Sequence, residues 1–162
     1  MNTFGKNVQM TIFGESHGEA IGIVISGLPA NLTIDHELIK KNLFARNTNK
    51  QISTKRSELD EYKIISGYFN EKTTGAPLTF IIENKDVDSS SYKKGVIRPN
   101  HADYPLYVKY DGANDYRGGG TSSGRLTALL VIAGSICEQI LRNKNINVYS
   151  YIKQIKDIKT SS

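Results

Sequence analysis

The long apolar run 126–141, which follows a glycine-rich loop, constrains the fold more than any other part of this sequence. Apolar residues occupy nearly every side of the helix that it would form, so we expect a central helix from Ser122 or Ser123 to about Asn143. The loop before it reads Asp115-Tyr-Arg-Gly-Gly-Gly-Thr-Ser-Ser-Gly-Arg125. Three successive glycines allow a close approach to the backbone, and hydroxyl groups follow at once. A loop of this kind before a helix is typical of an anion site, most often for phosphate.

A flexible turn before a core helix would also explain these glycines. Arg117 and Arg125 favour the anion site, because they place a fixed positive charge at either end of the loop.

The composition is that of a soluble globular protein with one domain. The chain has 162 residues, of which 38% are hydrophobic and 23% are charged, and its formal net charge is +5. The basic residues are scattered and form no nucleic-acid-binding motif, so we expect no nucleic acid partner. A modest positive excess suits a small polyanionic ligand.

We expect no membrane-spanning helix, because no apolar run reaches the roughly 20 residues that such a helix needs. The N-terminus lacks the features of a signal peptide. We therefore expect a cytoplasmic protein without a membrane partner. Cys137 is the only cysteine, so the sequence predicts no internal disulfide, and no cluster has the spacing of metal ligands.

The hydrophobic pattern predicts an α+β fold. Asp35 is a candidate N-cap for a helix that runs to about Arg46, with Leu38, Ile39 and Leu43 on its apolar face. His36, near the start of that helix, is expected at the surface. Residues 47–59 are polar and irregular, and 84–114 are expected to be mostly loop. The predicted strands are 8–13, 21–25, 62–69, 78–83 and 147–155. We expect one partial domain over 1–155 and a frayed tail over 156–162.

A first histidine, His17, lies between glycines in Gly14-Glu-Ser-His-Gly18, at a break in a predicted strand. The glycines leave room for a flat ligand beside the imidazole, which can give or take a proton near neutral pH. A histidine that hydrogen-bonds its own turn is the simpler explanation of this segment alone.

A second histidine, His101, lies in Ile97-Arg-Pro-Asn-His-Ala-Asp-Tyr104 within the long predicted loop. Asp103 could orient the imidazole, and Arg98 could hold an anion beside it. A solvated loop with an incidental ion pair would explain this segment equally well.

The ordered set of segments resembles the chorismate synthase family. The matching segments are Phe13–Gly18, Gly27-Leu-Pro29, Arg98–Tyr104, Asp115–Gly120 and Ser122–Arg125. The resemblance extends over nearly the whole chain. It implies a β-α-β sandwich, in which helices pack against mainly antiparallel sheets. Family members are far longer, so this chain would form the N-terminal half of that fold.

The resemblance also implies an activity, that of a phosphate lyase in the shikimate pathway of aromatic amino acid biosynthesis. The family converts 5-enolpyruvylshikimate 3-phosphate to chorismate by 1,4-elimination of phosphate and a ring proton. It implies reduced FMN as the cofactor, with NADPH as a candidate reductant of the flavin. The expected partners are a small polyanionic substrate and either a homo-oligomer, which is a tetramer in the family, or a missing C-terminal half.

Roles for single residues follow from the same resemblance. His17 matches the family histidine that acts at the reduced flavin, and His101 matches the one that protonates the departing phosphate. The residues expected to bind the cofactor are Thr121, Ser122, Ser123 and Arg125. Those expected to bind the substrate or another anion are Arg46, Arg56, Arg98 and Arg117.

The chain departs from the family at several positions expected to contact ligands. Ala45 and Gln51 stand where arginines are expected, and Thr121 replaces the arginine that follows the glycine triplet. Loss of a charge-assisted contact to a phosphate costs about 1.5–3 kcal/mol. With the missing half, these changes keep an alternative open: a catalytically impaired fragment, or an anion- or flavin-binding assembly module.

Overall fold

A computed structural model describes residues 2–47, 60–85 and 87–160 of the chain. Its centre is one five-stranded antiparallel sheet with the strand order β1-β2-β3-β7-β4. These strands are β1 (Thr3–Phe4), β2 (Gln9–Gly14), β3 (Ala20–Ser26), β4 (Tyr62–Ser66) and β7 (Leu78–Glu83). Two short hairpins lie outside the sheet, β5 (Tyr68–Phe69) with β6 (Lys72–Thr73), and β8 (Gln154–Ile155) with β9 (Ile158–Lys159).

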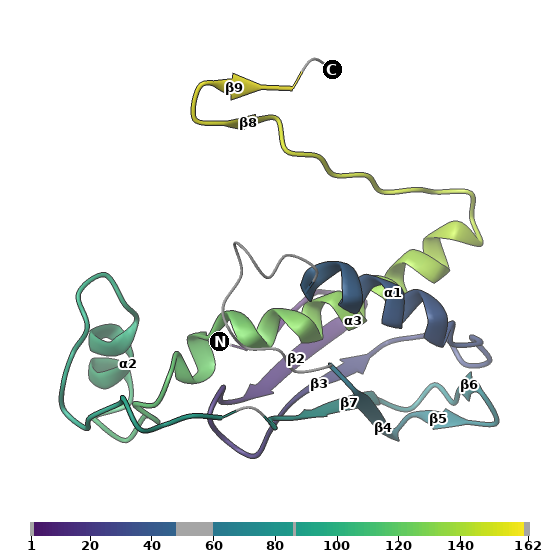
Figure 1. Cartoon of the computed structure of the whole chain (residues 1–162). Helices are drawn as coiled ribbons and strands as arrows, with labels where there is room; N and C mark the ends of the chain where they lie inside the picture. Colours follow the sequence, from purple (N-terminus) through teal and green to yellow (C-terminus); the bar gives the residue numbers. More distant parts are fainter. Residues whose placement is uncertain (1, 48–59, 86, 161–162) are drawn as a thin grey trace.

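Three α-helices complete the structure: α1 (His36–Asn47), α2 (Asp103–Lys109) and α3 (Thr127–Arg142). Two 3₁₀ turns, Gly120–Ser122 and Gly124–Leu126, precede α3. Helices α1 and α3 lie on the same face of the sheet (Figure 1). The α+β class is therefore confirmed, and the described residues supply one sheet and one helical layer.

The core lies between the sheet and these two helices. Alternate residues of β3 and β7 face the helices, and paired side chains such as Ile23 and Phe80 are completely buried. Leu129 and Ile132 of α3 are equally buried and belong to the same cluster. The period-2 pattern of the strands therefore meets the helical pattern in one apolar layer.

Helix α1 begins as the sequence predicts, because the Leu38 backbone N–H donates to Oδ1 of Asp35 at 2.9 Å. His36 is not the surface residue that we expected. Its ring nitrogens are hydrogen-bonded to the hydroxyl groups of Tyr62 at 2.7 Å and Tyr68 at 2.9 Å. Burial raises the pKa of Tyr62 to about 12, so this hydroxyl keeps its proton. The histidine thus ties the start of α1 to β4 and β5.

Helix α3 is less enclosed than its composition predicts. Leu130 and Gly134 are exposed on the side away from the sheet, so only one face of the helix is buried. Contrary to our expectation from run length, Gly124–Arg142 is long and apolar enough to cross a membrane by length and composition. Half of that window is buried inside the protein.

The described residues of 84–114 are mostly loop, as predicted, although α2 lies among them and none of its residues is buried. One other prediction of secondary structure is wrong. The predicted strand over 147–155 is reduced to β8, which pairs only with β9 in the expected tail. In the part of the chain that the structure describes, no strand lies beside 147–153, and an isolated segment has no ladder to join.

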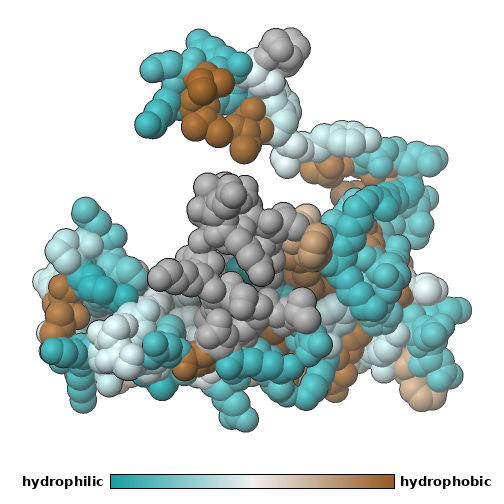
Figure 2. Space-filling model, viewed as in Figure 1, coloured by the Kyte–Doolittle hydropathy of each residue, from teal (hydrophilic) through white to brown (hydrophobic). Residues whose placement is uncertain are grey.

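The segment 147–160, here called the arm, extends away from the body of the protein (Figure 1). All of its residues are exposed, and Val148, Ile152, Ile155 and Ile158 give it an apolar surface that is visible in Figure 2.

Two neighbouring leucines of α3 test the position of the core. Leu129→Ala should lower the free energy of unfolding by about 2–5 kcal/mol, because it leaves a cavity between helix and sheet. Leu130→Ala is the matched control and should change it by about 0.5 kcal/mol or less, since this side chain is 40% exposed. Urea unfolding of both variants measures the difference, and equal losses would contradict this packing.

Candidate functional site

The glycine-rich loop lies directly against the turn that carries His17. The Ser16 backbone N–H donates to the carbonyl oxygen of Gly120 at 3.2 Å. Gly118 has a φ of +56°, and a Cβ at this position would lie 2.3 Å from the imidazole of His17. Only glycine fits this close approach without strain, so the loop can pack against His17 only because Gly118 has no side chain.

His17 contacts its own turn and also a residue far along the chain. Its Nδ1 is hydrogen-bonded to Oγ of Ser16 at 3.1 Å, as the simpler explanation of this segment requires. The ring also meets Tyr92 edge to face, with 5.0 Å between centroids. Among the described residues, none forms a hydrogen bond to Nε2 of His17.

Asp103 organises the second histidine segment. Its Oδ1 is hydrogen-bonded to Nδ1 of His101 at 2.8 Å, and its two oxygens accept from Nε and Nη2 of Arg98 at 2.8 Å each. Hydrogen bonds from Arg98 hold the pKa of the Asp103 carboxyl well below its usual range, and Asp103 in turn raises the pKa of Arg98. The expected orienting role of Asp103 therefore has a geometric basis.

Arg98 joins the two histidine segments to the glycine loop. Its Nη2 donates to the carbonyl oxygen of Gly118, the residue packed against His17. Its guanidinium also lies over the ring of Tyr92, 5.1 Å from the centroid. Tyr92 thus contacts both His17 and Arg98. Sequence reasoning missed this tyrosine, because no spacing or neighbouring motif distinguishes it from the other eight.

Arg125 is directed into the protein. Its side chain is 5% exposed and forms an ion pair with Asp60, and its Nε donates to Oδ1 of Asn84 at 3.2 Å. Arg46 binds the other oxygen of Asp60 at 3.1 Å and donates to the Gly124 carbonyl at 3.1 Å. Arg46 and Arg125, both predicted to bind ligands, therefore share the buried carboxylate of Asp60 near the start of α3.

The other predicted ligand residues lie along the glycine loop. Arg117 binds Asp115 at 2.8 Å, which lowers the pKa of that carboxyl. Ser122 is exposed and Thr121 is half-buried, whereas the Ser123 hydroxyl accepts from the Arg125 backbone N–H at 3.2 Å. Arg56 lies outside the described residues. The binding roles of all these residues stay predictions.

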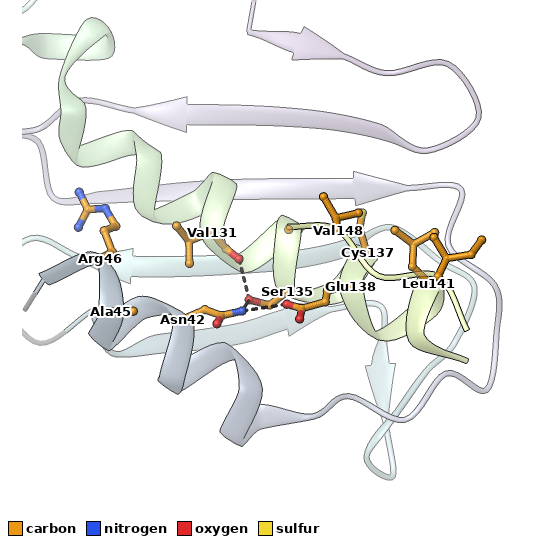
Figure 3. Close-up of a pocket in the computed structure, with 11 residues that line it drawn as sticks. Asn42, Ala45, Arg46, Val131, Ser135, Cys137, Glu138, Leu141 and Val148 are labelled. Atoms are coloured by element: carbon orange, nitrogen blue, oxygen red, sulfur yellow. Dashed lines mark hydrogen bonds between the residues drawn. The ribbon is translucent and has the colours of Figure 1, made fainter. Parts of the chain in front are cut away.

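A separate groove of about 570 Å³ lies between α1 and α3, where Figure 3 shows Asn42 hydrogen-bonded to Ser135 and Glu138. Of the described residues that line it, Arg46 is the only predicted site residue, and neither His17 nor His101 is among them. Cys137 lines it and is half-buried rather than part of the core, and burial raises the pKa of its thiol. Over 2–47, 60–85 and 87–160, no three His, Cys, Asp or Glu side chains gather as metal ligands.

Comparison with known proteins identifies the family of this chain. The sequence model described as chorismate synthase matches residues 8–162. The chain belongs to the chorismate synthase family. Chorismate synthase of Thermococcus kodakarensis is 48% identical over 153 residues, which are 93% of this chain and 43% of that protein. Chorismate synthase of Methanococcoides burtonii is 46% identical over 161 residues, 98% of this chain and 44% of that protein.

A crystal structure of chorismate synthase has the same fold, with a TM-score of 0.69 and 27% identity. The match covers 95% of this chain and 39% of that one. The chain therefore spans less than half the length of the chorismate synthases that it matches.

Gly118 and Gly124 allow a matched test of the close approach to His17. Gly118→Ala should lower the free energy of unfolding by about 1–3 kcal/mol, since alanine is strained at this positive φ and its Cβ displaces the imidazole. Gly124→Ala should have little effect, because a Cβ there has nothing within 4 Å. Urea unfolding measures both, and equal stability of the two variants would contradict the packing of the loop.

The ion pairs of Asp103 predict a dependence of stability on pH. The folded state lowers the pKa of this carboxyl, so its stabilisation is complete above the unfolded pKa of about 3.9 and is lost as the pH falls through the folded value. Asp103→Asn should therefore be less stable than the wild type at pH 7, and the difference should shrink progressively as the pH falls below about 3.9.

Urea unfolding between pH 7 and pH 2 measures this difference. Asp157→Asn, on the exposed arm, is the control and should match the wild type throughout. A difference for Asp103→Asn that stays constant with pH would contradict the assignment.

Proposed function

We propose that this chain carries the N-terminal part of a chorismate synthase active site, which eliminates phosphate from 5-enolpyruvylshikimate 3-phosphate with reduced FMN to give chorismate. The supporting observation is that three segments distant in the sequence meet around Gly118. His17 packs against this glycine, and Arg98 of the His101 segment donates to its carbonyl. A site in which one imidazole packs against the glycine loop, and the segment of a second reaches it through Arg98, suits proton transfer beside an anion.

His101 acts in this proposal as the general acid for the departing phosphate. Asp103 holds Nδ1, so the imidazole presents Nε2, and a third of its side chain is exposed to receive a ligand. A proton delivered from Nε2 to the phosphate oxygen makes phosphate a better leaving group. Arg98 is hydrogen-bonded to the same Asp103 carboxylate and would supply positive charge beside the leaving group.

The donor set of the cluster fits a flat, anionic cofactor such as FMN. The glycine loop presents backbone without a side chain beside His17, and its exposed Ser122 offers a hydroxyl on the same loop. Thr121, Ser122 and Ser123 would hold the cofactor, whereas Arg125, also expected there from the sequence, is buried and paired with Asp60. Reduced FMN would supply the electron that assists loss of phosphate and would take it back without net redox change. NADPH is the proposed reductant.

The short coverage of the relatives supports a further part of the proposal. Because the chain spans about 43% of the Thermococcus kodakarensis protein, the complete site would need the remaining half or further copies of this chain. We propose a homo-oligomer, a tetramer as in the family, or association with a C-terminal half. The proposed compartment is the cytoplasm.

Anaerobic phosphate release from 5-enolpyruvylshikimate 3-phosphate, with chemically reduced FMN, tests this function. We expect release by the wild-type chain and a loss of about 100-fold or more in His17→Ala and His101→Ala, because each lacks a proton-transferring group. His36→Ala is the control histidine and should retain the wild-type rate per folded protein. Release without FMN, or undiminished release in the two site variants, would contradict the proposal.

A binding module that lacks the chemistry is the second candidate, favoured by the coverage of less than half of each relative. It predicts that FMN and substrate raise the melting temperature of the folded chain while no phosphate is released. Supplying a C-terminal half from a relative then separates the two: restored release identifies this chain as half of an enzyme, and continued silence identifies a binding module.

A further inference from the structure

Asn84 lies immediately after β7 and grips the turn that carries His17. Its Nδ2 donates to the carbonyl oxygens of Glu15 at 3.0 Å and Gly18 at 2.9 Å. Its backbone N–H donates to the carbonyl of Glu19 at 3.0 Å. One residue thereby binds the turn on both sides of His17, and the amide offers both of its hydrogens to backbone carbonyls.

The orientation of this amide is fixed from the other side. Its Oδ1 accepts from Nε of Arg125 at 3.2 Å, and Arg125 is buried and paired with Asp60. A flipped amide would direct NH₂ toward a guanidinium and an oxygen toward two carbonyls, which is unfavourable at both ends. The chain of contacts thus runs from Asp60 through Arg125 and Asn84 to the histidine turn.

We propose that Asn84 is a positioning residue that sets the location of the His17 imidazole, with Arg125 as the group that orients its amide. The inference rests on the proposed function, in which His17 acts at the site. Asn84 itself contacts backbone and not the reacting groups. Its effect on the reaction is exerted through the turn 15–18.

Asn84→Asp removes both donors while it preserves shape and the acceptor for Arg125. We expect the turn to shift, because a carboxylate would face two carbonyl oxygens. Asn42→Asp is the matched control, since Asn42 also donates twice from a half-buried amide, to Ser135 at 3.0 Å and Glu138 at 3.2 Å. It lies in the groove between α1 and α3, away from His17.

NMR of the full chain with ¹³C-labelled histidine reads the position of His17 without any activity. The sequence has three histidines, so the ring signals are few and His17→Ala assigns the relevant one. The Tyr92 ring lies 5.0 Å from His17 and shifts its proton signals according to geometry. We expect the His17 signal to move or broaden in Asn84→Asp, with the His36 signal unchanged, and to remain in place in Asn42→Asp.

Phosphate release supplies the functional measurement. We expect kcat of Asn84→Asp to fall about 10- to 100-fold, as displaced catalytic groups generally cause, while Asn42→Asp stays close to the wild type. A His17 signal that stays in place in folded Asn84→Asp overturns the proposal. A chain that releases no phosphate even when a C-terminal half is supplied overturns the proposed function alone, because a displaced His17 signal would still establish the positioning role.

A second variant covers the case in which Asn84→Asp does not fold. Arg125→Lys keeps the charge beside Asp60, but a single ammonium does not reproduce the two directions of the guanidinium. The Asn84 amide then loses its fixed orientation. We expect the same displacement of the His17 signal, and an unmoved signal in this folded variant overturns the proposal.

Discussion

The buried carboxylate of Asp60 is the interaction on which the rest of this structure depends. It is 1% exposed and binds both Arg46 from α1 and Arg125 from the start of α3. Removal of one partner from a buried pair leaves a charge uncompensated and costs about 3–5 kcal/mol. The ion pairs of Asp60 therefore connect α1 to the segment that precedes α3. Through Arg125 and Asn84, the network of contacts extends to the turn at the end of β2.

A second constraint acts where the backbone itself does the packing. Gly118 brings its Cα against an imidazole and directs its carbonyl toward Arg98. A side chain at that point would separate the two histidine segments. The glycine triplet is therefore needed for packing within the chain, in addition to any contact with a ligand.

The sequence predicted the elements with strong periodicity and missed what depends on tertiary contacts. The cap at Asp35, the apolar face of α1 and the strands around Ile23 and Phe80 follow from local patterns. The strand predicted over 147–155 was wrong because alternation alone does not supply a neighbouring strand, and α2 was not foreseen because it buries none of its residues. The family resemblance pointed to His17 and His101, whose roles stay predictions, whereas Tyr92 and Asn84 have contacts with partners distant in the chain that no local pattern reveals.

The separation of contacting residues along the sequence has a kinetic consequence. Gln139 of α3 accepts from the backbone of Asp35 across a separation of 104 residues, and the turn at Ser16 is closed by Gly120. Contacts between remote segments form only after large loops have closed, so they form late in folding. The contacts within each histidine segment are local, but the contact between the two segments at Gly118 has no local precursor. It forms when the sheet and helices have docked.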